Sequence, residues 1–159
     1  MTKRNVQYNR ENTEDALLLS NQLCFALHSC SLELTKLYRP LLAPLQLTYP
    51  QYLVMLVLWE RKSVPVKELG IELHLDSGTL TPLLKNLERA GLVHRERNPS
   101  DERSVIISLT KKGAGLRDKA QSIPDELGCR LGLSASRVDS LLQEITALRN
   151  HIREHRLQG

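Results

Sequence analysis

Residues 64–113 carry the clearest indications of the fold and read VPVKELGIELHLDSGTLTPLLKNLERAGLVHRERNPSDERSVIISLTKKG. Its first part predicts a helix over residues 65–74, a break at residues 76–78 that offers an N-cap, and a second helix. The apolar residues at helical spacing are Val66, Leu69 and Leu73 in the first helix and Leu80, Leu83, Leu84, Leu87 and Ala90 in the second. Gly91 suits the C-cap of the second helix. Two short helices joined by a tight turn predict a helix-turn-helix, with the second as recognition helix.

The second part of the stretch predicts a β-hairpin directly after the recognition helix. Residues 92–97 and 104–109 alternate in polarity, and residues 98–101 are turn formers. Such a hairpin is a wing, and arginines near its tip can enter a minor groove, where negative potential is concentrated. The alternative is a solvated surface hairpin in which Arg103 pairs with Asp101. The adjacent helix pair favours DNA binding.

Length and composition fit one domain with helical extensions. The chain has 159 residues, a net charge of +4 and a pI of about 9.1, so charge alone does not indicate DNA as the partner. Basic residues do recur along the stretch, at Lys85, Arg89, Arg95, Arg97, Arg103, Lys111 and Lys112. No apolar run reaches membrane-spanning length and no signal peptide opens the chain, so we expect a cytoplasmic protein that does not contact membranes. Three cysteines in that compartment predict no disulfide framework. We expect no cofactor and no metal.

The organisation along the chain follows from these patterns. Residues 1–12 are polar and aperiodic, and predict a flexible tail. Residues 13–45 predict a long N-terminal helix, capped by Thr13 and ending near Leu42. Residues 46–110 contain the winged helix-turn-helix, preceded by an apolar helix and a short link. Residues 111–159 predict C-terminal helices, with Thr110 and Ser134 as caps, and the apolar face of the last helix needs a partner. The fold class is therefore mainly α with a small β-hairpin wing.

Two cysteines of the long N-terminal helix lie on different stripes. Cys30 recurs with leucines at helical spacing and is expected to be a small core residue. Cys24 lies on a stripe of polar residues that includes His28, Ser31, Thr35 and Tyr38. Neighbouring hydroxyls, amides and an imidazole can stabilise a thiolate, which is the form that reacts with peroxides. A lone helical cysteine is more often a packing residue, which is the competing interpretation.

The segment LDSGTLTPLLKNLERAGLVHRERNPSDERSVIISLTKKG resembles the winged helix-turn-helix of MarR-family transcription regulators. Asp101-Glu102-Arg103 stands where that family carries its wing-tip D-x-R. The similarity extends from about Leu19 to about Leu141. It implies a homodimer whose recognition helices occupy successive major grooves of a roughly palindromic double-stranded operator. It also implies DNA contacts from Ser77, Thr79, Pro82, Lys85, Arg95, Arg97, Asp101 and Arg103. Thr79 has the alternative role of starting its helix.

Three further segments resemble the organic-hydroperoxide-sensing branch of these regulators. They are NQLCFAL at residues 21–27, KLYRPLL at residues 36–42 and LTYPQY at residues 47–52. The resemblance implies that Cys24 is the peroxidatic residue. It also implies that Tyr38 and Tyr49, the latter from the partner subunit, hydrogen-bond its sulfur. The sequence departs from the pattern at His28, where relatives often carry another tyrosine, and His28 could replace that hydrogen bond.

Cys129 separates two subclasses of these sensors. Some regulators of this branch carry a second cysteine in a late linker, and it attacks the oxidised cysteine across the dimer. Cys129 stands at the matching place, and its separation from Cys24 (129 − 24 = 105 residues) resembles the two-cysteine type. This resemblance implies an intersubunit disulfide. The alternative is that Cys129 is a packing residue.

These observations predict a repressor that is induced by organic hydroperoxides and releases its operator when Cys24 is oxidised. Three other functions compete with it. A MarR-type repressor relieved by a small aromatic ligand would not need Cys24. A thiol peroxidase would leave the wing unexplained. A metal sensor could use the helical pair His151 and His155, but no cysteine–histidine cluster of zinc spacing accompanies that pair.

Overall fold

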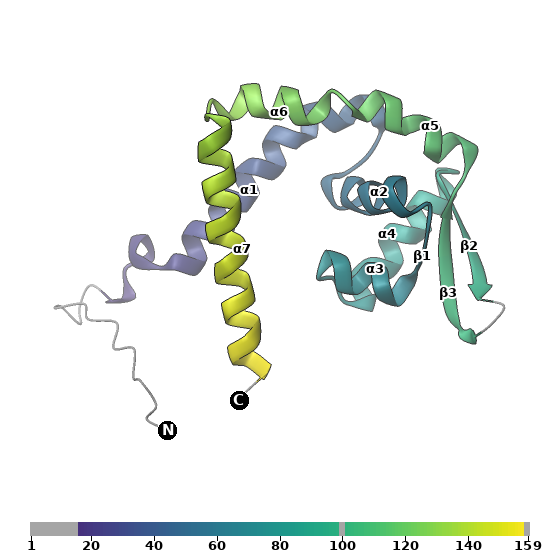
Figure 1. The fold of residues 1–159 in the computed structure, drawn as a ribbon, viewed down its shortest axis with the longest axis horizontal. Helices are drawn as coiled ribbons and strands as arrows, with labels where there is room; N and C mark the ends of the chain where they lie inside the picture. Colours follow the sequence, from purple (N-terminus) through teal and green to yellow (C-terminus); the bar gives the residue numbers. More distant parts are fainter. Residues whose placement is uncertain (1–15, 99–100, 158–159) are drawn as a thin grey trace. The chain divides into compact units, whose positions relative to one another are not determined.

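The computed structural model describes residues 16–98 and 101–157, which form helices and one small sheet (Figure 1). In chain order the elements are η2 (Leu19–Asn21), α1 (Leu23–Leu42), η3 (Ala43–Leu45), α2 (Tyr49–Arg61), β1 (Ser63–Pro65), α3 (Val66–Leu73), α4 (Ser77–Arg89), β2 (Val93–Asn98), β3 (Asp101–Leu109), α5 (Lys111–Ala120), α6 (Ile123–Leu131) and α7 (Ala135–Leu157). Contacts divide the chain into two units, Met1–Leu37 and Tyr38–Gly159, with the boundary inside α1. The expected flexible tail, residues 1–12, lies outside the described residues.

The first long helix begins later than the sequence indicates. A start at Thr13 is predicted, but α1 begins at Leu23, and Thr13 itself is not among the described residues. Gln22 is extended, with φ −91° and ψ 113°. Its side-chain amide donates to the carbonyls of Ala16 (2.6 Å) and Leu18 (3.1 Å), which fixes a 3₁₀ turn, η2, ahead of the helix. Local side-chain bonds of this kind compete with continuous helix. The predicted end near residue 42 is confirmed.

The apolar side chains of the first unit are at most partly covered in the single chain. None of residues 16–37 is buried: on the leucine stripe Leu23 is exposed and Leu27, Leu34 and Leu37 are half-buried. Phe25 and Leu32, on the opposite side of the helix, are also exposed. Cys30 is exposed as well, so the expectation that it is a core residue is wrong for the isolated subunit. A single amphipathic helix cannot bury its own apolar stripe, and this face therefore needs another helix to cover it.

The helix-turn-helix is confirmed as α3 and α4. Pro65 stands at the N-cap of α3, and His74 ends that helix in the left-handed conformation with φ 55°. The carboxylate of Asp76 caps α4 by accepting the backbone N–H of Thr79 at 2.8 Å. Gly91, with φ 71°, follows the end of α4 at the position where a left-handed residue terminates a helix.

The core of the second unit lies where α2, α3, α4 and the sheet meet. The apolar stripe of the recognition helix supplies its central residues, Leu80, Leu84 and Leu87, each 1% exposed or less. Helix α2 contributes six buried residues, including Tyr52 and Trp59. Within the described parts of the chain, no single helix is long and apolar enough to cross a membrane. Only α1 with η3, taken together with α2 as a bent pair, passes that test by length and composition.

A short strand before α3 completes the sheet. The sequence indicates only a link at residues 61–63, but Ser63–Pro65 forms β1 and pairs antiparallel with β3, Ser63 opposite Ser108. The strand order is β1-β3-β2. Lys62 turns the chain into β1 with φ 63°, and its carbonyl accepts the Leu109 N–H at 3.2 Å. Three residues carry too little periodicity to predict a strand, and pairing with β3 creates it.

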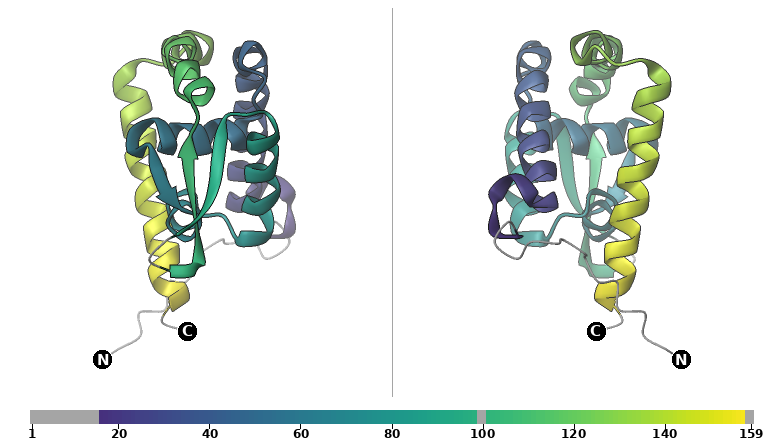
Figure 2. Two further views of the ribbon diagram at one scale, coloured as in Figure 1. Left: turned by 90° about the vertical axis from the view of Figure 1, so that its right-hand side faces the viewer. Right: turned by 90° about the vertical axis from the view of Figure 1, so that its left-hand side faces the viewer.

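The wing hairpin is confirmed as β2 and β3. β3 is longer than the predicted segment 104–109, because it begins at Asp101, and β2 is shifted by one residue from the predicted 92–97, to Val93–Asn98. A bulge interrupts the pairing between Arg97 and Asn98. The two strands run side by side away from α5 (Figure 2). Turn positions 99 and 100 lie outside the described residues.

The C-terminal caps are also confirmed. Thr110 caps α5 by accepting the Gly113 N–H at 2.9 Å, and Ser134 caps α7 by accepting the Arg137 N–H at 3.3 Å. The segment around Cys129 is more helical than expected, since Cys129 lies inside α6 rather than in a linker. The apolar face of α7 is exposed in the single chain, at Val138, Leu142, Ile145 and Ile152.

Candidate redox site and DNA-contact surface

Cys24 is an exposed thiol in the first turn of α1. The first N–H groups of a helix have no acceptor within the helix, and their partial positive charge favours an anion nearby. His28 follows one turn later on the same face and is exposed. An oxidant can therefore reach the sulfur of Cys24 from solvent in the single chain.

Two tyrosines predicted for the sensor site lie against each other in the second unit. The ring centroids of Tyr38 and Tyr49 are 4.6 Å apart, and that of Tyr52 is 5.9 Å from Tyr38. Burial, followed by the neighbouring Tyr49 and Tyr52, raises the pKa of Tyr38 to about 12. Burial also raises the pKa of Tyr49. The hydroxyl groups therefore stay protonated at neutral pH and can act as hydrogen-bond donors.

Alkaline titration tests this environment of Tyr38. The pKa of about 12 lies above the value of about 10 for an unfolded tyrosine, so the unfolded chain loses this proton first. This difference between the folded and unfolded pKa stabilises the folded protein. The stabilisation is fully present below a pH of about 10 and is lost as the pH rises towards 12. We expect Tyr38→Phe to remove the latest step of the tyrosinate absorbance titration and to flatten the alkaline loss of stability. A wild-type titration in which no tyrosine ionises later than the others would contradict the raised pKa of Tyr38.

The second candidate redox residue, Cys129, belongs to the second unit. It is exposed and lies in the last turns of α6, three residues before Gly132 ends the helix with φ 64°. Neither Cys24 nor Cys129 forms a disulfide within the chain. Both thiols are therefore accessible on one subunit, and their predicted pairing would be between subunits.

The recognition helix presents its predicted DNA-contact residues to solvent. Ser77, Thr79, Pro82 and Lys85 are all exposed, while the leucine stripe on the opposite side is buried. Thr79 also serves the helix start, because its hydroxyl donates to the Asp76 carboxylate at 3.1 Å. Hydrogen bonds from Thr79, first from its backbone N–H and then from its hydroxyl, lower the pKa of Asp76. The position of Thr79 is thus compatible with both of its predicted roles, contact with DNA and starting the helix.

The wing arginines differ in their surroundings. Arg97 is exposed. Arg95 is half-buried, with its Nη1 atom 3.9 Å from the carboxylate of Glu88 in α4. Its Nε atom is buried and makes no hydrogen bond to the described residues. The side chains of Asp101 and Arg103 lie outside the described part of the structure, so the D-x-R prediction remains a prediction.

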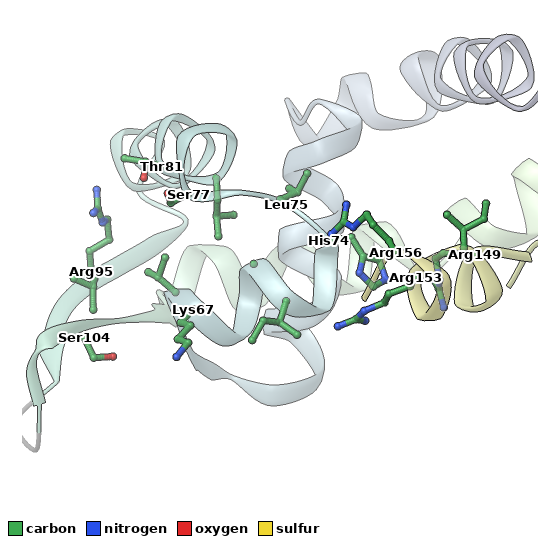
Figure 3. A pocket seen from close by; sticks show the side chains of 16 residues that line it. Lys67, His74, Leu75, Ser77, Thr81, Arg95, Ser104, Arg149, Arg153 and Arg156 are labelled. Atoms are coloured by element: carbon green, nitrogen blue, oxygen red, sulfur yellow. The ribbon is translucent and has the colours of Figure 1, made fainter. Parts of the chain in front are cut away.

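A cavity with a basic lining adjoins α3, α4 and the wing, and sequence reasoning missed it. Its volume is about 970 Å³, and it includes the apolar residues Ile71 and Ile152. Five cationic side chains line it (Figure 3): Lys67 and Arg95 on the side of α3 and the wing, and Arg149, Arg153 and Arg156 on α7. Among the described residues, no Asp or Glu lines it. The spacing of the three α7 arginines at i, i+4 and i+7 was the available signal.

The histidine pair considered for a metal is also present. The rings of His151 and His155 in α7 lie edge to face, 4.3 Å apart. Two ligands are fewer than the three or four of ordinary protein sites. Within residues 16–98 and 101–157, no group of three or more His, Cys, Asp or Glu residues is placed to hold a metal ion.

The chain is similar to known transcriptional regulators. The sequence model of the family described as "Transcriptional regulator SarA/Rot" matches residues 36–120, more than half of the chain. An "Organic hydroperoxide resistance transcriptional regulator" of Bacillus subtilis (strain 168) is 53% identical over 138 residues, covering 87% of this chain and 92% of the relative.

Solved structures of AbfR show the same fold. The structure of reduced AbfR bound to DNA has a TM-score of 0.72 and 33% identity, covering 89% of this chain and 99% of that one. The structure of disulfide-formed AbfR has a TM-score of 0.58 and 34% identity, covering 89% of this chain and 96% of that one. By sequence and by fold, the chain belongs to the MarR family of winged helix-turn-helix transcriptional regulators, in the branch of organic hydroperoxide resistance regulators.

Proposed function

We propose that the protein is a cytoplasmic, homodimeric repressor that binds a palindromic operator and releases it when an organic hydroperoxide oxidises Cys24. The exposed thiol of Cys24 in the first turn of α1 is the observation that carries this proposal. It belongs to a chain whose second unit is a winged helix-turn-helix and whose relative is named for organic hydroperoxide resistance. No catalytic turnover is needed, because one oxidation per Cys24 changes the occupancy of the operator.

The chemistry has two steps. The Cys24 thiolate attacks an oxygen of the hydroperoxide ROOH, the O–O bond breaks, and with one proton the products are the sulfenic acid Cys–SOH and the alcohol ROH. The thiol of Cys129 in the partner subunit then attacks that sulfur. An S–S bond forms, and the hydroxyl leaves as water with the proton of the thiol. Sulfur is oxidised and the peroxide is reduced, so no further reactant is required.

The contact between Tyr38 and Tyr49 indicates which subunit contributes them to the site around Cys24. Cys24 and Tyr38 are 14 residues apart in α1, and at 1.5 Å per residue this separates them by about 21 Å along the helix. Tyr38 therefore cannot bond the sulfur of its own subunit. Since Tyr49 touches Tyr38, we assign both tyrosines to the site built around Cys24 of the partner subunit. There they would donate hydrogen bonds to the reactive sulfur.

Uncovered apolar surface supports the homodimer. Helices α1 and α7 expose large apolar side chains, among them Leu23, Leu32, Leu142 and Ile145. A second copy of the chain would cover these faces with the matching ones. The two recognition helices would then read half-sites through Ser77, Pro82 and Lys85, with Thr79 at the helix start.

We assign Arg97, Asp101 and Arg103 of the wing, together with Arg95 at its base, to the flanking minor groove. This is the arrangement that the D-x-R resemblance implies. Loss of several such phosphate and groove contacts is enough to reduce operator occupancy many-fold.

Non-reducing gel electrophoresis tests the role of Cys129. After one equivalent of cumene hydroperoxide, wild type should run as a covalent dimer, and both Cys24→Ser and Cys129→Ser should run as monomers. Cys30→Ser is the matched control, because Cys30 is exposed on the same helix as Cys24, and it should still form the dimer. A covalent dimer in Cys129→Ser would contradict the assignment of the resolving thiol.

The basic cavity supports a second candidate function. Apolar residues together with five cationic side chains suit a small aromatic anion, the ligand of the alternative repressor. In that case Cys24→Ser would remain fully inducible by such a ligand, and operator binding would ignore hydroperoxide. Operator binding by Cys24→Ser, measured with salicylate and with cumene hydroperoxide in parallel, separates the two functions.

A further inference from the structure

A row of aromatic rings leads from the tyrosine pair into the core of the second unit. The aromatic row consists of Tyr49, Tyr38, Tyr52 and Trp59. Its successive ring centroids are 4.6, 5.9 and 6.0 Å apart. Tyr52 and Trp59 are 3% and 9% exposed, so this end of the row is packed inside the protein. Because neighbouring rings of the row lie close together, a displacement of Tyr38 or Tyr49 would be transmitted through Tyr52 to Trp59.

Trp59 joins the aromatic row to the first turn of α5. Its indole N–H donates to the carbonyl of Gly113 at 2.9 Å in a buried setting. The backbone of Gly113 lies directly on the chain that enters the wing, because a Cβ atom built on Gly113 would be 2.0 Å from the Leu92 carbonyl oxygen. Trp59 is thus hydrogen-bonded to the point where α5 touches the base of the wing.

Hydrogen bonds connect that point to the end of the recognition helix. The hydroxyl of Thr110 donates to the carbonyl of Gly91 at 2.7 Å and accepts the Gly113 N–H at 2.9 Å. The Lys112 ammonium donates to the carbonyl of Ala90 at 2.7 Å. The end of α4, the start of β2 and the first turn of α5 therefore form one hydrogen-bonded junction.

We propose that Trp59 is a positioning residue that couples the tyrosine pair to this junction, so that oxidation of the Cys24 sulfur beside the pair displaces the recognition helix and wing. The inference rests on the proposed function, since it supplies the route by which Cys24 oxidation alters DNA binding. Trp59 acts through Tyr52 on one side and Gly113 on the other, and it touches neither the oxidant nor DNA.

The space beside Trp59 gives α5 and α6 room to move. A cavity of about 300 Å³ lies between α2 and the α5–α6 segment, lined by Tyr52 and Trp59 on one side and by Arg117 and Pro124 on the other. The α6 helix also carries Cys129. A pull on Cys129 could shift this segment into the cavity, while the indole hydrogen bond passes the movement to the wing.

The fluorescence of Trp59 tests the inference in the intact wild-type core, since it is the only tryptophan of the chain. Cumene hydroperoxide should change the Trp59 emission in wild type and leave it unchanged in Cys24→Ser. Release of operator DNA by oxidised wild type without any change in Trp59 emission would overturn the inference while leaving the proposed function standing.

Trp59→Phe tests the hydrogen bond to Gly113. Its yield of oxidised Cys24 should equal that of wild type, whereas the ratio of operator Kd values after and before oxidation should fall about tenfold, as for other residues that couple sites. Val57→Ala, a buried change in the same helix, is the matched control for stability and should keep the wild-type ratio. An unchanged ratio in Trp59→Phe would overturn the inference. An unchanged Kd in oxidised wild type would overturn it together with the proposed function.

Discussion

Cys24→Ser should bind operator DNA as wild type does and should no longer respond to organic hydroperoxides. Serine has nearly the size of cysteine, and Cys24 is exposed, so we expect the free energy of unfolding to change by no more than about 0.5 kcal/mol. A serine hydroxyl does not react with peroxides at neutral pH, so no sulfenic acid can form. Oxidation should weaken operator binding of wild type by roughly 5- to 150-fold, the usual range of allosteric coupling, and that of the variant not at all.

The response of Cys24→Ser is measured by titrating labelled operator with protein before and after cumene hydroperoxide. Cys30→Ser changes another exposed cysteine of the same helix and should respond as wild type does. A hydroperoxide response that persists in Cys24→Ser and disappears in Cys30→Ser would transfer the sensing role to Cys30.

Gly113→Ala should destabilise the second unit strongly. The new Cβ would lie 2.0 Å from the Leu92 carbonyl oxygen, 3.0 Å from the Leu92 carbonyl carbon and 3.2 Å from a methyl of Leu109. The nearest atoms belong to backbone that is hydrogen-bonded at the base of the wing, so they cannot rotate away. We expect a loss of about 3 kcal/mol or more in the free energy of unfolding, at the upper end of overpacking costs.

The matched control for this change is Gly115→Ala in the same helix, where nothing lies within 4 Å of the added Cβ. It should stabilise the protein by about 0.4–1 kcal/mol, because alanine is the better helix former and restricts the unfolded chain. Chemical denaturation of both variants measures the difference. Equal stability of Gly113→Ala and Gly115→Ala would contradict the close contact between α5 and Leu92.

The helix-turn-helix was predictable from sequence because its signals are local. The leucine stripe of α4, the Asp76 cap and the left-handed Gly91 act within one or two turns of chain. The caps Thr110 and Ser134 are equally local and were predicted correctly. Alternating polarity likewise predicted the two wing strands, although not the full length of β3.

The features that sequence reasoning missed depend on contacts between distant segments or on a second chain. Strand β1 exists because Ser63 lies opposite Ser108, 45 positions along the chain (108 − 63 = 45). The hydrogen bond from Trp59 to Gly113 likewise spans 54 residues. The late start of α1 depends on side-chain bonds of Gln22 that compete with helix. Cys30 shares the leucine stripe that predicts burial, yet it is exposed in the single chain, where no second helix covers it.

The candidate site was only partly predictable for the same reason. The resemblance predicts a sensor role for Tyr38 and Tyr49, but their mutual contact at 4.6 Å required the fold, and that contact is the basis for our proposal that one subunit supplies both. The basic cavity combines Lys67 of α3 with Arg149, Arg153 and Arg156 of α7, which are far apart in sequence.

Fluorescence anisotropy of labelled operator DNA with the wild-type protein tests whether oxidation of Cys24 controls DNA binding. The reduced protein is titrated first, then the protein treated with one equivalent of cumene hydroperoxide, and then the same sample after a thiol reductant. We expect oxidation to weaken binding and the reductant to restore it, because a disulfide is reversible by thiol exchange. Operator binding of equal strength in all three titrations, with Cys24 shown to be oxidised, would contradict the claim that Cys24 controls DNA binding.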